Sequence, residues 1–372
     1  MRKILTIFGT RPEAIKLAPV IKELSKSKDR LESIVGVTGQ HDKLLKQVLD
    51  IFKIRPSFNL NVMRKNQNLT DLTASILKKM GKILDDIKPD LVLVQGDTTT
   101  VFTTALAAFY RKIMIGHVEA GLRTEDKYQP FPEEINRRLA DQVSDLFFAP
   151  TEGNMANLVK SGIPTEQIYV TGNTVVDALL EIASSDHSPS IRGLKDIPEK
   201  MILITAHRRE NFGEPFKNVF KALQDLAQIY KDFHFVYPVH PNPNVHDLAY
   251  HMLSGIENIY LIKPVDYLSF IYLMKKSHIV LTDSGGIQEE APTLNKPVLI
   301  LREKTERGEI LDAGGAILVG TNREKIIEET VKLISNVQHY TQMSHIKNPF
   351  GDGNASQKIV QILKEYFQLC QN

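Results

Sequence analysis

Short apolar runs alternate with helical patterns along the first half of the chain. Continuous apolar character predicts buried strands at residues 3–8, 33–38, 90–95, 112–118, 146–149 and 168–171. Helices are predicted at residues 42–52 and 72–87, where apolar side chains recur every three or four positions. Apolar strands joined by helices are typical of a parallel sheet that is covered on both faces.

The pattern is interrupted at residues 172–198 and then begins again. A helix at 175–183 is followed by a polar stretch, Ser184–Ser190, that is typical of an exposed linker. Further strands are predicted at residues 201–205, 233–238, 259–262, 279–282, 298–301 and 316–319. A chain of 372 residues is long enough for two domains. We therefore expect a first α/β domain at 1–171, a linker region at 172–198, a second α/β domain at 199–353 and a final helix at 354–372.

Open parallel sheets bind ligands beyond the carboxyl ends of their strands. With two such doubly wound domains, the cleft between them is the expected site. The polar clusters of this chain follow predicted strands in both halves, as that expectation requires.

Charge and composition exclude several classes of protein. Lys and Arg number 46 and Asp and Glu 44, so the net charge of +2 argues against a general binder of nucleic acid or membrane surfaces. No apolar stretch is long enough to cross a membrane, and the N-terminus does not resemble a signal peptide. The single cysteine, Cys370, excludes an internal disulfide framework and fits a reducing cytoplasm. The histidines form no spaced ligand set, so no metal is expected, and no GxGxxG fingerprint indicates a dinucleotide.

Two clusters of the first domain suit anion binding and proton transfer. A glycine turn enters a predicted helix at Gly9–Glu13, and Arg11 and Lys16 add cations that suit a diphosphate. A plain helix start with solvated charges is the alternative. Asp97 directly follows a buried strand, where it is either a functional acid or a helix cap.

Two more carboxylates follow the next predicted strand. Glu119 comes directly after it, and Glu133 opens a helix after two prolines. A helix N-terminus favours acids in any protein, which is the structural alternative for Glu133. If Asp97, Glu119 and Glu133 line one pocket, burial and mutual repulsion raise the pKa of some of them and prepare them as general acids or bases.

The second domain carries two candidate anion sites. His207, Arg208 and Arg209 follow its first strand and form either an anion site or a basic surface loop. Ser284, Gly285 and Gly286 form a strand-to-helix turn that lets a phosphate approach backbone amides, although purely structural turns have the same composition. One turn later, Glu290 could accept two hydrogen bonds from a ribose diol.

Taken together, these motifs resemble the non-hydrolysing UDP-N-acetylglucosamine 2-epimerases of bacteria and archaea. The resemblance runs from residue 1 to about residue 360 and rests on five motifs in the same order: Gly9–Ala14, Gly96–Thr100, His117–Arg123, His207–Asn211 and Asp283–Pro292. It implies the GT-B architecture of two Rossmann-like domains, with the C-terminal helix packing back on the first. It also implies a homodimer that interconverts UDP-N-acetylglucosamine and UDP-N-acetylmannosamine without NAD or metal, for surface polysaccharide synthesis.

The resemblance also assigns residues. It implies that Asp97, Glu119 and Glu133 are the essential carboxylates, with Arg137 beside them, and that His207 contributes to catalysis. The implied contacts to the diphosphate, sugar, ribose and uracil come from Arg11, Lys16, His207, Phe270, Ser284, Gly285, Gly286, Glu290 and Arg307. A possible allosteric site for the substrate comprises Gln40, His41, Gln67, Arg209 and His240. One departure is Gly308, where family members usually have Pro.

The family chemistry eliminates UDP to give 2-acetamidoglucal and then adds UDP back, with the proton returning to the opposite face of C2. Cations and amides stabilise the departing diphosphate, and two faces require two proton-handling groups or one group with a water. Which carboxylate serves which face stays open at this stage. A hydrolysing relative, a glycosyltransferase of the same architecture and a non-catalytic nucleotide-sugar sensor are the alternatives.

Overall fold

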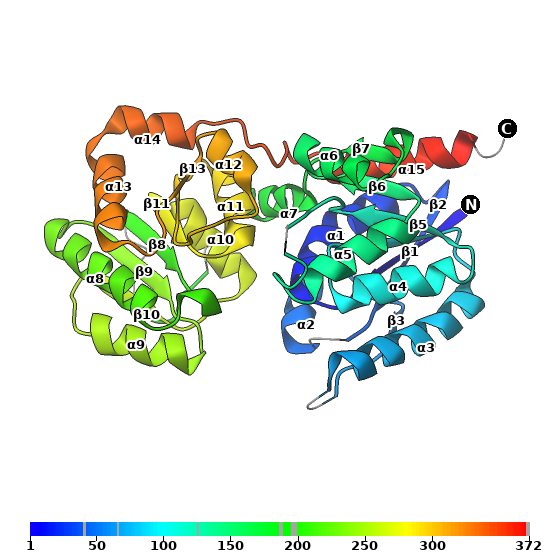
Figure 1. The fold of residues 1–372 in the computed structure, drawn as a ribbon, viewed down its shortest axis with the longest axis horizontal. Helices are drawn as coiled ribbons and strands as arrows, with labels where there is room; N and C mark the ends of the chain where they lie inside the picture. Colours follow the sequence, from blue (N-terminus) through cyan, green and yellow to red (C-terminus); the bar gives the residue numbers. More distant parts are fainter. Residues whose placement is uncertain (40–41, 65–66, 125, 186–188, 195–198, 370–372) are drawn as a thin grey trace. The chain divides into compact units, whose positions relative to one another are not determined.

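The computed structural model describes residues 1–39, 42–64, 67–124, 126–185, 189–194 and 199–369 (Figure 1). The chain divides into two compact units. Unit 1 comprises Met1–Ala178 and Phe350–Asn372, and unit 2 comprises Leu179–Pro349.

Unit 1 is built on a seven-stranded sheet in the order β3-β2-β1-β4-β5-β6-β7, and every pairing is parallel. Its central strands are apolar on both faces because helices cover both sides. The strands are β1 (Arg2–Phe8), β2 (Leu31–Val37), β3 (Phe58–Asn59), β4 (Leu91–Gln95), β5 (Met114–Val118), β6 (Leu146–Ala149) and β7 (Ile168–Val170).

The helices of unit 1 fall into two packed groups. One group contains α3, α4 and α5 in a row, and in the other α1 contacts both α2 and α15. The helices are α1 (Arg11–Ser25), α2 (Asp42–Ile51), α3 (Leu69–Ile87), α4 (Thr99–Phe109), α5 (Glu133–Val143), α6 (Glu152–Lys160), the 3₁₀ turn η1 (Thr165–Gln167), α7 (Thr174–Ala183, which crosses the unit boundary) and α15 (Ala355–Leu369).

The last helix, α15, completes unit 1 from the far end of the chain. It packs on α1 and begins at a buried acid of α7. The Asp177 carboxylate accepts hydrogen bonds from the backbone N–H of Ser356 (2.8 Å) and of Ala355 (3.2 Å). Asp177 thus caps the first turn of a helix that lies almost 180 residues away in sequence.

Unit 2 repeats the architecture with a six-stranded parallel sheet in the order β10-β9-β8-β11-β12-β13. Its core gathers apolar side chains of β8, β9 and α8, including the stacked rings of Phe216 and Phe220. The strands are β8 (Met201–Thr205), β9 (His234–Pro238), β10 (Ile259–Ile262), β11 (Ile279–Thr282), β12 (Val298–Ile300) and β13 (Ala316–Leu318).

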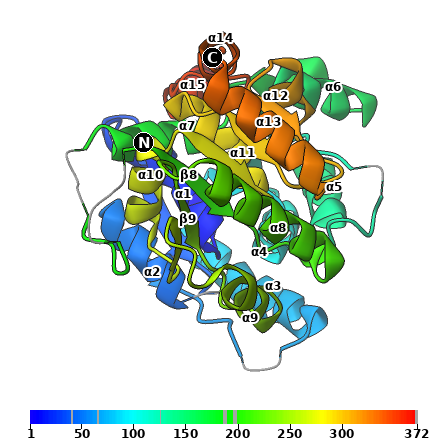
Figure 2. The ribbon, with the colours of Figure 1, turned by 90° about the vertical axis from the view of Figure 1, so that its left-hand side faces the viewer.

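In unit 2, α8 lies between α9 and α13 along one side of the sheet (Figure 2). The shorter helices follow the strand ends that carry the polar motifs. The elements are η2 (Arg209–Asn211), α8 (Glu214–Ile229), α9 (Pro243–Leu253), α10 (Tyr267–Lys276), α11 (Gly285–Glu290), η3 (Ala291–Leu294), α12 (Gly308–Asp312), α13 (Arg323–Ser335) and α14 (Val337–Ser344).

The predicted fold class of two doubly wound parallel-sheet domains is confirmed. The strands differ from prediction only locally. The fifth begins at Met114 rather than Lys112, because Lys112 has a φ of 56° and hydrogen-bonds back to Phe109 in a turn that ends α4. The two-residue strand β3 was not predicted.

In each sheet, candidate motifs follow the two strands between which the strand order reverses. The order reverses between β1 and β4 in unit 1 and between β8 and β11 in unit 2. In doubly wound sheets the ligand crevice lies at this reversal. Within the described residues, no helix is long and apolar enough to span a membrane.

Candidate active site

The ends of β1 and β4 are joined by one buried carboxylate, Glu13. Its side chain is only 2% exposed and accepts hydrogen bonds from the backbone N–H of Gly9 (3.1 Å) and Thr10 (2.7 Å) and from the Thr98 hydroxyl (2.8 Å). Thr10 and Glu13 form the capping box of α1. Burial raises the pKa of Glu13 to about 7, against the opposing effect of these hydrogen bonds. Glu13 therefore ties the glycine turn after β1 to the turn that carries Asp97.

This raised pKa predicts a pH-dependent stability. The folded protein holds a proton on Glu13 at pH values where the unfolded chain, with an ordinary Glu pKa of about 4.3, has lost it. Its contribution to stability is therefore complete below about pH 4.3 and declines as the pH rises to about 7. Relative to Glu13→Gln, the wild type should lose about 3 kcal/mol of unfolding free energy across that range. Urea unfolding of both proteins at pH 5 and pH 8 measures the difference, and an equal pH dependence would contradict it.

Glu119 follows β5 in a left-handed conformation, with a φ of 62°. Non-glycine residues adopt this region rarely, and where they do the surrounding contacts hold them. The Glu119 carboxylate is buried and accepts hydrogen bonds from the Lys16 ammonium and the Gln95 amide, and from Asn173 Nδ2 at 3.1 Å. Lys16, predicted at the diphosphate or sugar, is thus an ion-pair partner of Glu119 in this structure.

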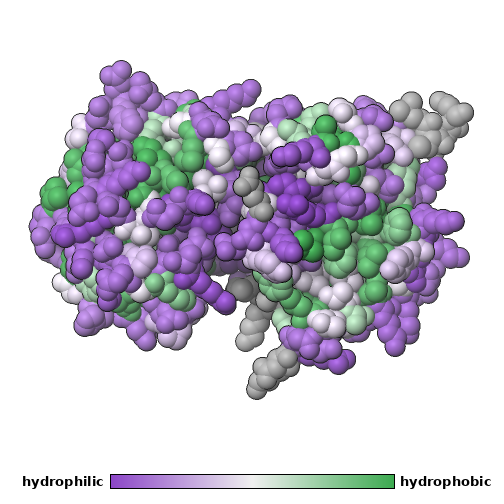
Figure 3. Space-filling view, in the orientation of Figure 1, coloured by the Kyte–Doolittle hydropathy of each residue, from purple (hydrophilic) through white to green (hydrophobic). Residues whose placement is uncertain are grey.

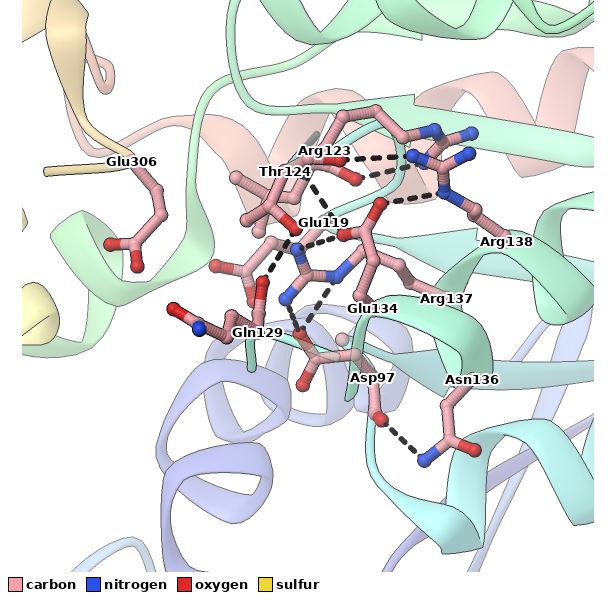
Figure 4. Close-up of polar contacts among 12 residues, drawn as sticks. Asp97, Glu119, Arg123, Thr124, Gln129, Glu134, Asn136, Arg137, Arg138 and Glu306 are labelled. Atoms are coloured by element: carbon pink, nitrogen blue, oxygen red, sulfur yellow. Dashed lines mark hydrogen bonds and ion pairs between the residues drawn. The ribbon is translucent and has the colours of Figure 1, made fainter. Parts of the chain in front are cut away.

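Asp97 lies beside the guanidinium of Arg137 on α5. Arg137 donates from Nη2 and, at 3.1 Å, from Nε to Asp97 Oδ2, while Asn136 Nδ2 donates to the Asp97 carbonyl at 3.0 Å (Figure 4). The structure therefore brings together Asp97 and Arg137, as predicted from sequence. Glu133, the first residue of α5, lies one turn before Arg137 on the same helix.

A second buried acid, Glu134, holds Arg137 from the other side. Its Oε2 accepts from Arg137 Nη1 at 3.0 Å and from the Thr124 N–H at 3.0 Å, and its Oε1 accepts from Arg138 Nε at 2.6 Å (Figure 4). The Arg137 guanidinium is therefore clamped between Asp97 and Glu134, which fixes the position of the positive charge next to Asp97.

In unit 2, Asp283 organises the turn that carries His207. Asp283 is fully buried after β11, and its Oδ2 accepts from the backbone N–H of His207 (2.7 Å) and Arg208 (2.8 Å). His207 Nδ1 lies 3.4 Å from Asp283 Oδ1, and the ring stacks on His240 with centroids 5.4 Å apart. Burial lowers the pKa of His207, so the neutral imidazole prevails at pH 7.

The turn after β11 presents the predicted phosphate residues. Ser284 precedes α11, and its N–H donates to the Thr282 hydroxyl at 2.9 Å. Glu290 accepts from the Tyr267 hydroxyl at 2.8 Å, and Arg307 Nε donates to Glu289 at 2.9 Å. A Cβ built on Gly285 would lie 3.0 Å from the Arg307 guanidinium. Phe270, predicted at the uracil, is half-buried on α10.

The predicted allosteric residues belong to both units. Arg209 is exposed at the start of the turn η2, and His240 follows β9. Gln67 precedes α3 in unit 1, where its side-chain oxygen accepts from the Arg64 N–H at 3.2 Å. Gln40 and His41 lie outside the described residues. The regulatory assignment stays a prediction.

The residues that hold these groups in place were not predicted as site residues. Gln95 and Asn173 bind Glu119, Glu134 binds Arg137, and Asp283 binds the backbone of His207. The partners of Gln95, Asn173 and Asp283 lie 24, 54 and 76 positions away, so no local pattern reveals them. Glu134 and Arg137, in contrast, are an i,i+3 pair on α5. Among the described residues, no group of three or more His, Cys, Asp or Glu side chains is arranged to hold a metal ion.

Comparison with known proteins gives a consistent result. Residues 22–364 match a family model described as UDP-N-acetylglucosamine 2-epimerase. The chain is 50% identical over 368 residues to the UDP-N-acetylglucosamine 2-epimerase of Neisseria meningitidis, covering 97% of this chain and 99% of that one. A crystal structure of the N. meningitidis enzyme bound to UDP-GlcNAc superposes with a TM-score of 0.88 at 49% identity, over 98% of this chain and 100% of that one. The crystal structure of the Methanocaldococcus jannaschii enzyme in complex with UDP-GlcNAc and UDP superposes with a TM-score of 0.81 at 37% identity, over 98% of this chain and 99% of that one.

Proposed function

Because the chain belongs to the UDP-N-acetylglucosamine 2-epimerase family, we propose that it is an isomerase that interconverts UDP-N-acetylglucosamine and UDP-N-acetylmannosamine. The observation that carries the proposal is the set of carboxylates at the ends of β4 and β5. Asp97 and Glu119 each contact a cation, Arg137 and Lys16, and Glu133 stands on the same helix as Arg137.

The reaction proposed for this chain begins with an elimination. One carboxylate of unit 1 removes the proton from C2 while the C1–O bond to UDP breaks, which leaves a C1=C2 double bond in 2-acetamidoglucal. UDP oxygen then bonds again to C1, and a proton is delivered to the opposite face of C2. Positive charge and backbone amides stabilise the negative charge that develops on the departing diphosphate. We assign the positive charge to Arg11 and Arg307 and the amides to Gly285 and Gly286. Ser284 and the neutral ring of His207 would add hydrogen bonds, and Glu290 would bind the ribose.

The proposal predicts isotope exchange at one carbon. Incubation with UDP-N-acetylglucosamine in heavy water should give UDP-N-acetylmannosamine with deuterium at C2, because the proton removed there exchanges with solvent. A proton NMR time course follows both epimers and their C2 signals together. Product that retains protium at C2 contradicts the elimination mechanism.

The same time course separates the rival functions. Free UDP accumulating in equal amount to N-acetylmannosamine indicates a hydrolysing enzyme, and a spectrum that never changes despite saturable binding indicates a sensor. Heat-inactivated protein is the control for spontaneous hydrolysis.

We further propose that the protein is a homodimer that uses an apolar face of unit 1. Ile135 (37% exposed) and Leu139 (42%) lie on one side of α5 at a four-residue spacing, and Tyr128 (64%) and Phe131 (62%) precede the helix. Apolar atoms gather on the surface of unit 1 in the region of α4 and α5 (Figure 3). A second copy of the chain would bury this face.

Sedimentation velocity tests the dimer. The wild type should sediment as a dimer and Leu139→Glu as a monomer or a weakened dimer, because the new charge would be buried without a partner. Val337→Glu, at an apolar position of α14 that is 76% exposed, is the matched control and should leave the dimer intact. A monomeric wild type would overturn the proposal.

The cellular role and location of the protein stay predictions. These are the supply of N-acetylmannosamine for surface polysaccharide and a cytoplasmic location.

A further inference from the structure

One histidine of the first sheet, His117, links the three segments that carry Asp97, Glu119 and Glu133. His117 is on β5, two residues before Glu119, and its side chain is fully buried. Its Nε2 lies 2.7 Å from the carbonyl oxygen of Gly96, the residue directly before Asp97. Its Nδ1 lies 2.7 Å from Oδ1 of Asp141, which is also fully buried.

The chemistry of these two partners determines the protonation of the ring. A carbonyl oxygen can only accept a hydrogen bond, so Nε2 must carry a hydrogen. An ionised carboxylate also only accepts, so Nδ1 must carry one as well. The second oxygen of Asp141, Oδ2, lies 2.7 Å from Nη1 of Arg123, a permanent cation that favours the ionised carboxylate. The ring therefore has both nitrogens protonated and carries a positive charge in the interior of unit 1.

Asp141 connects this charge to the helix of the active site. Glu133, Arg137 and Asp141 follow one another at four-residue intervals on α5 and therefore share one face of that helix. The bond from His117 to Asp141 fixes this face against the sheet. The bond to the Gly96 carbonyl fixes the turn in which Gly96 has a φ of 78°.

We propose that His117 is a positioning residue of the epimerase: a constitutively charged imidazolium that ties the Asp97 turn to α5 and so sets the distance between Asp97, Glu133 and Glu119. The activity-based part of this inference rests on the proposed function. The other charged groups of the cluster are Asp97 after β4, Arg123 after β5 and Asp141 on α5. Helix α4 and strand β6 also pack beside β5, and neither of them contains a titratable side chain.

The protonation state can be measured without any assay of activity. In protein labelled with ¹⁵N-histidine, proton–nitrogen correlation spectra should show both ring nitrogens of His117 protonated at pH 8, where an ordinary histidine with a pKa of about 6.5 is neutral. His117→Gln identifies the signal. A ring that carries one proton at pH 8 overturns the proposal whatever the protein catalyses.

Substitution of Asp141 tests the coupling to catalysis. Asp141→Asn removes the anion and lets the buried ring lose its charge at ordinary pH. We expect kcat to fall about 100-fold at pH 8, as displacement of a catalytic group by about 1 Å can cost that much. Activity should then recover several-fold as the pH falls to 6, because the ring regains its proton, whereas the wild type shows no such recovery. A loss that is equal at pH 6 and pH 8 would indicate a purely structural role and overturn the proposal.

Two replacements of the ring separate its two bonds. The amide nitrogen of Gln can take the place of Nε2 and reach the Gly96 carbonyl, whereas the shorter Asn can take the place of Nδ1 and reach only Asp141. His117→Gln should therefore retain more of kcat than His117→Asn, with the Kd for UDP within about twofold of the wild type in both. The reverse order contradicts a role through the Asp97 turn. Near-ultraviolet circular dichroism verifies that each variant is folded, and wild-type turnover in the same assay separates failure of this inference from failure of the proposed function.

Discussion

Asp97→Asn is expected to lower kcat for epimerisation by about 10³-fold, within the range that loss of a general acid or base produces. The substitution keeps the shape of the side chain and an oxygen that can accept from Arg137, but it removes the ability to take up or deliver a proton. Steady-state rates by coupled assay or NMR measure the effect. Glu152→Gln, on the exposed first turn of α6, is the matched control and should leave kcat within about twofold.

The three carboxylate variants together can assign the faces of C2. If Asp97 serves one face and Glu119 or Glu133 the other, each amide variant should block exchange of the C2 proton with heavy water from one epimer more than from the other. Starting separate reactions from UDP-N-acetylglucosamine and UDP-N-acetylmannosamine reveals the asymmetry. Full activity in Asp97→Asn would remove Asp97 from the mechanism.

Gly286→Val is expected to weaken UDP binding about 100-fold without destabilising the protein. Outside its chain neighbours and the backbone of α11, no heavy atom of the described residues lies within 4 Å of a Cβ built on Gly286, so the fold leaves space where the valine side chain begins. The proposed phosphate contacts leave no such space, because the valine side chain would lie where the diphosphate approaches the amides of α11. Two lost hydrogen bonds to a charged group, at about 1.5 kcal/mol or more each, account for the magnitude.

Calorimetric titration with UDP measures this effect, and thermal unfolding without ligand checks the fold. Gly153→Val on the exposed surface of α6 controls for the introduction of valine into a helix. Unchanged affinity in Gly286→Val would place the diphosphate elsewhere. A lower melting temperature in that variant alone would instead indicate a structural need for glycine.

Much of the fold was predictable because the central strands are buried on both faces. A strand such as Leu91–Gln95 is apolar almost throughout, so it stands out from its amphipathic neighbours. The same logic placed Asp97 and His207 at strand ends, since a polar residue directly after such a run lies where parallel strands terminate. The short strand β3 escaped prediction, because two residues carry no periodicity.

The supporting groups of the site were not predictable from local pattern. Glu13 reads as an ordinary acid in a first helical turn, yet the fold buries it against Thr98, 85 positions away. Asp141 reads as a polar position in the middle of a helix, and only the packing of α5 on the sheet brings it to His117. Asp97, Glu119 and His207, which are proposed to act on the substrate, follow strand ends, whereas only tertiary contacts identify the residues that hold them in place.

The capping of α15 by Asp177 has a consequence for synthesis of the protein. Unit 1 is discontinuous in sequence and unit 2 is continuous, so the ribosome completes all of unit 2 before it releases the helix that covers α1. Because domains generally fold as they emerge, unit 2 can close while α1 still exposes an apolar strip. Transiently exposed apolar surface of this kind promotes aggregation, so we expect the nascent chain to need protection there. A stop codon near residue 350 would leave the strip exposed in the released product.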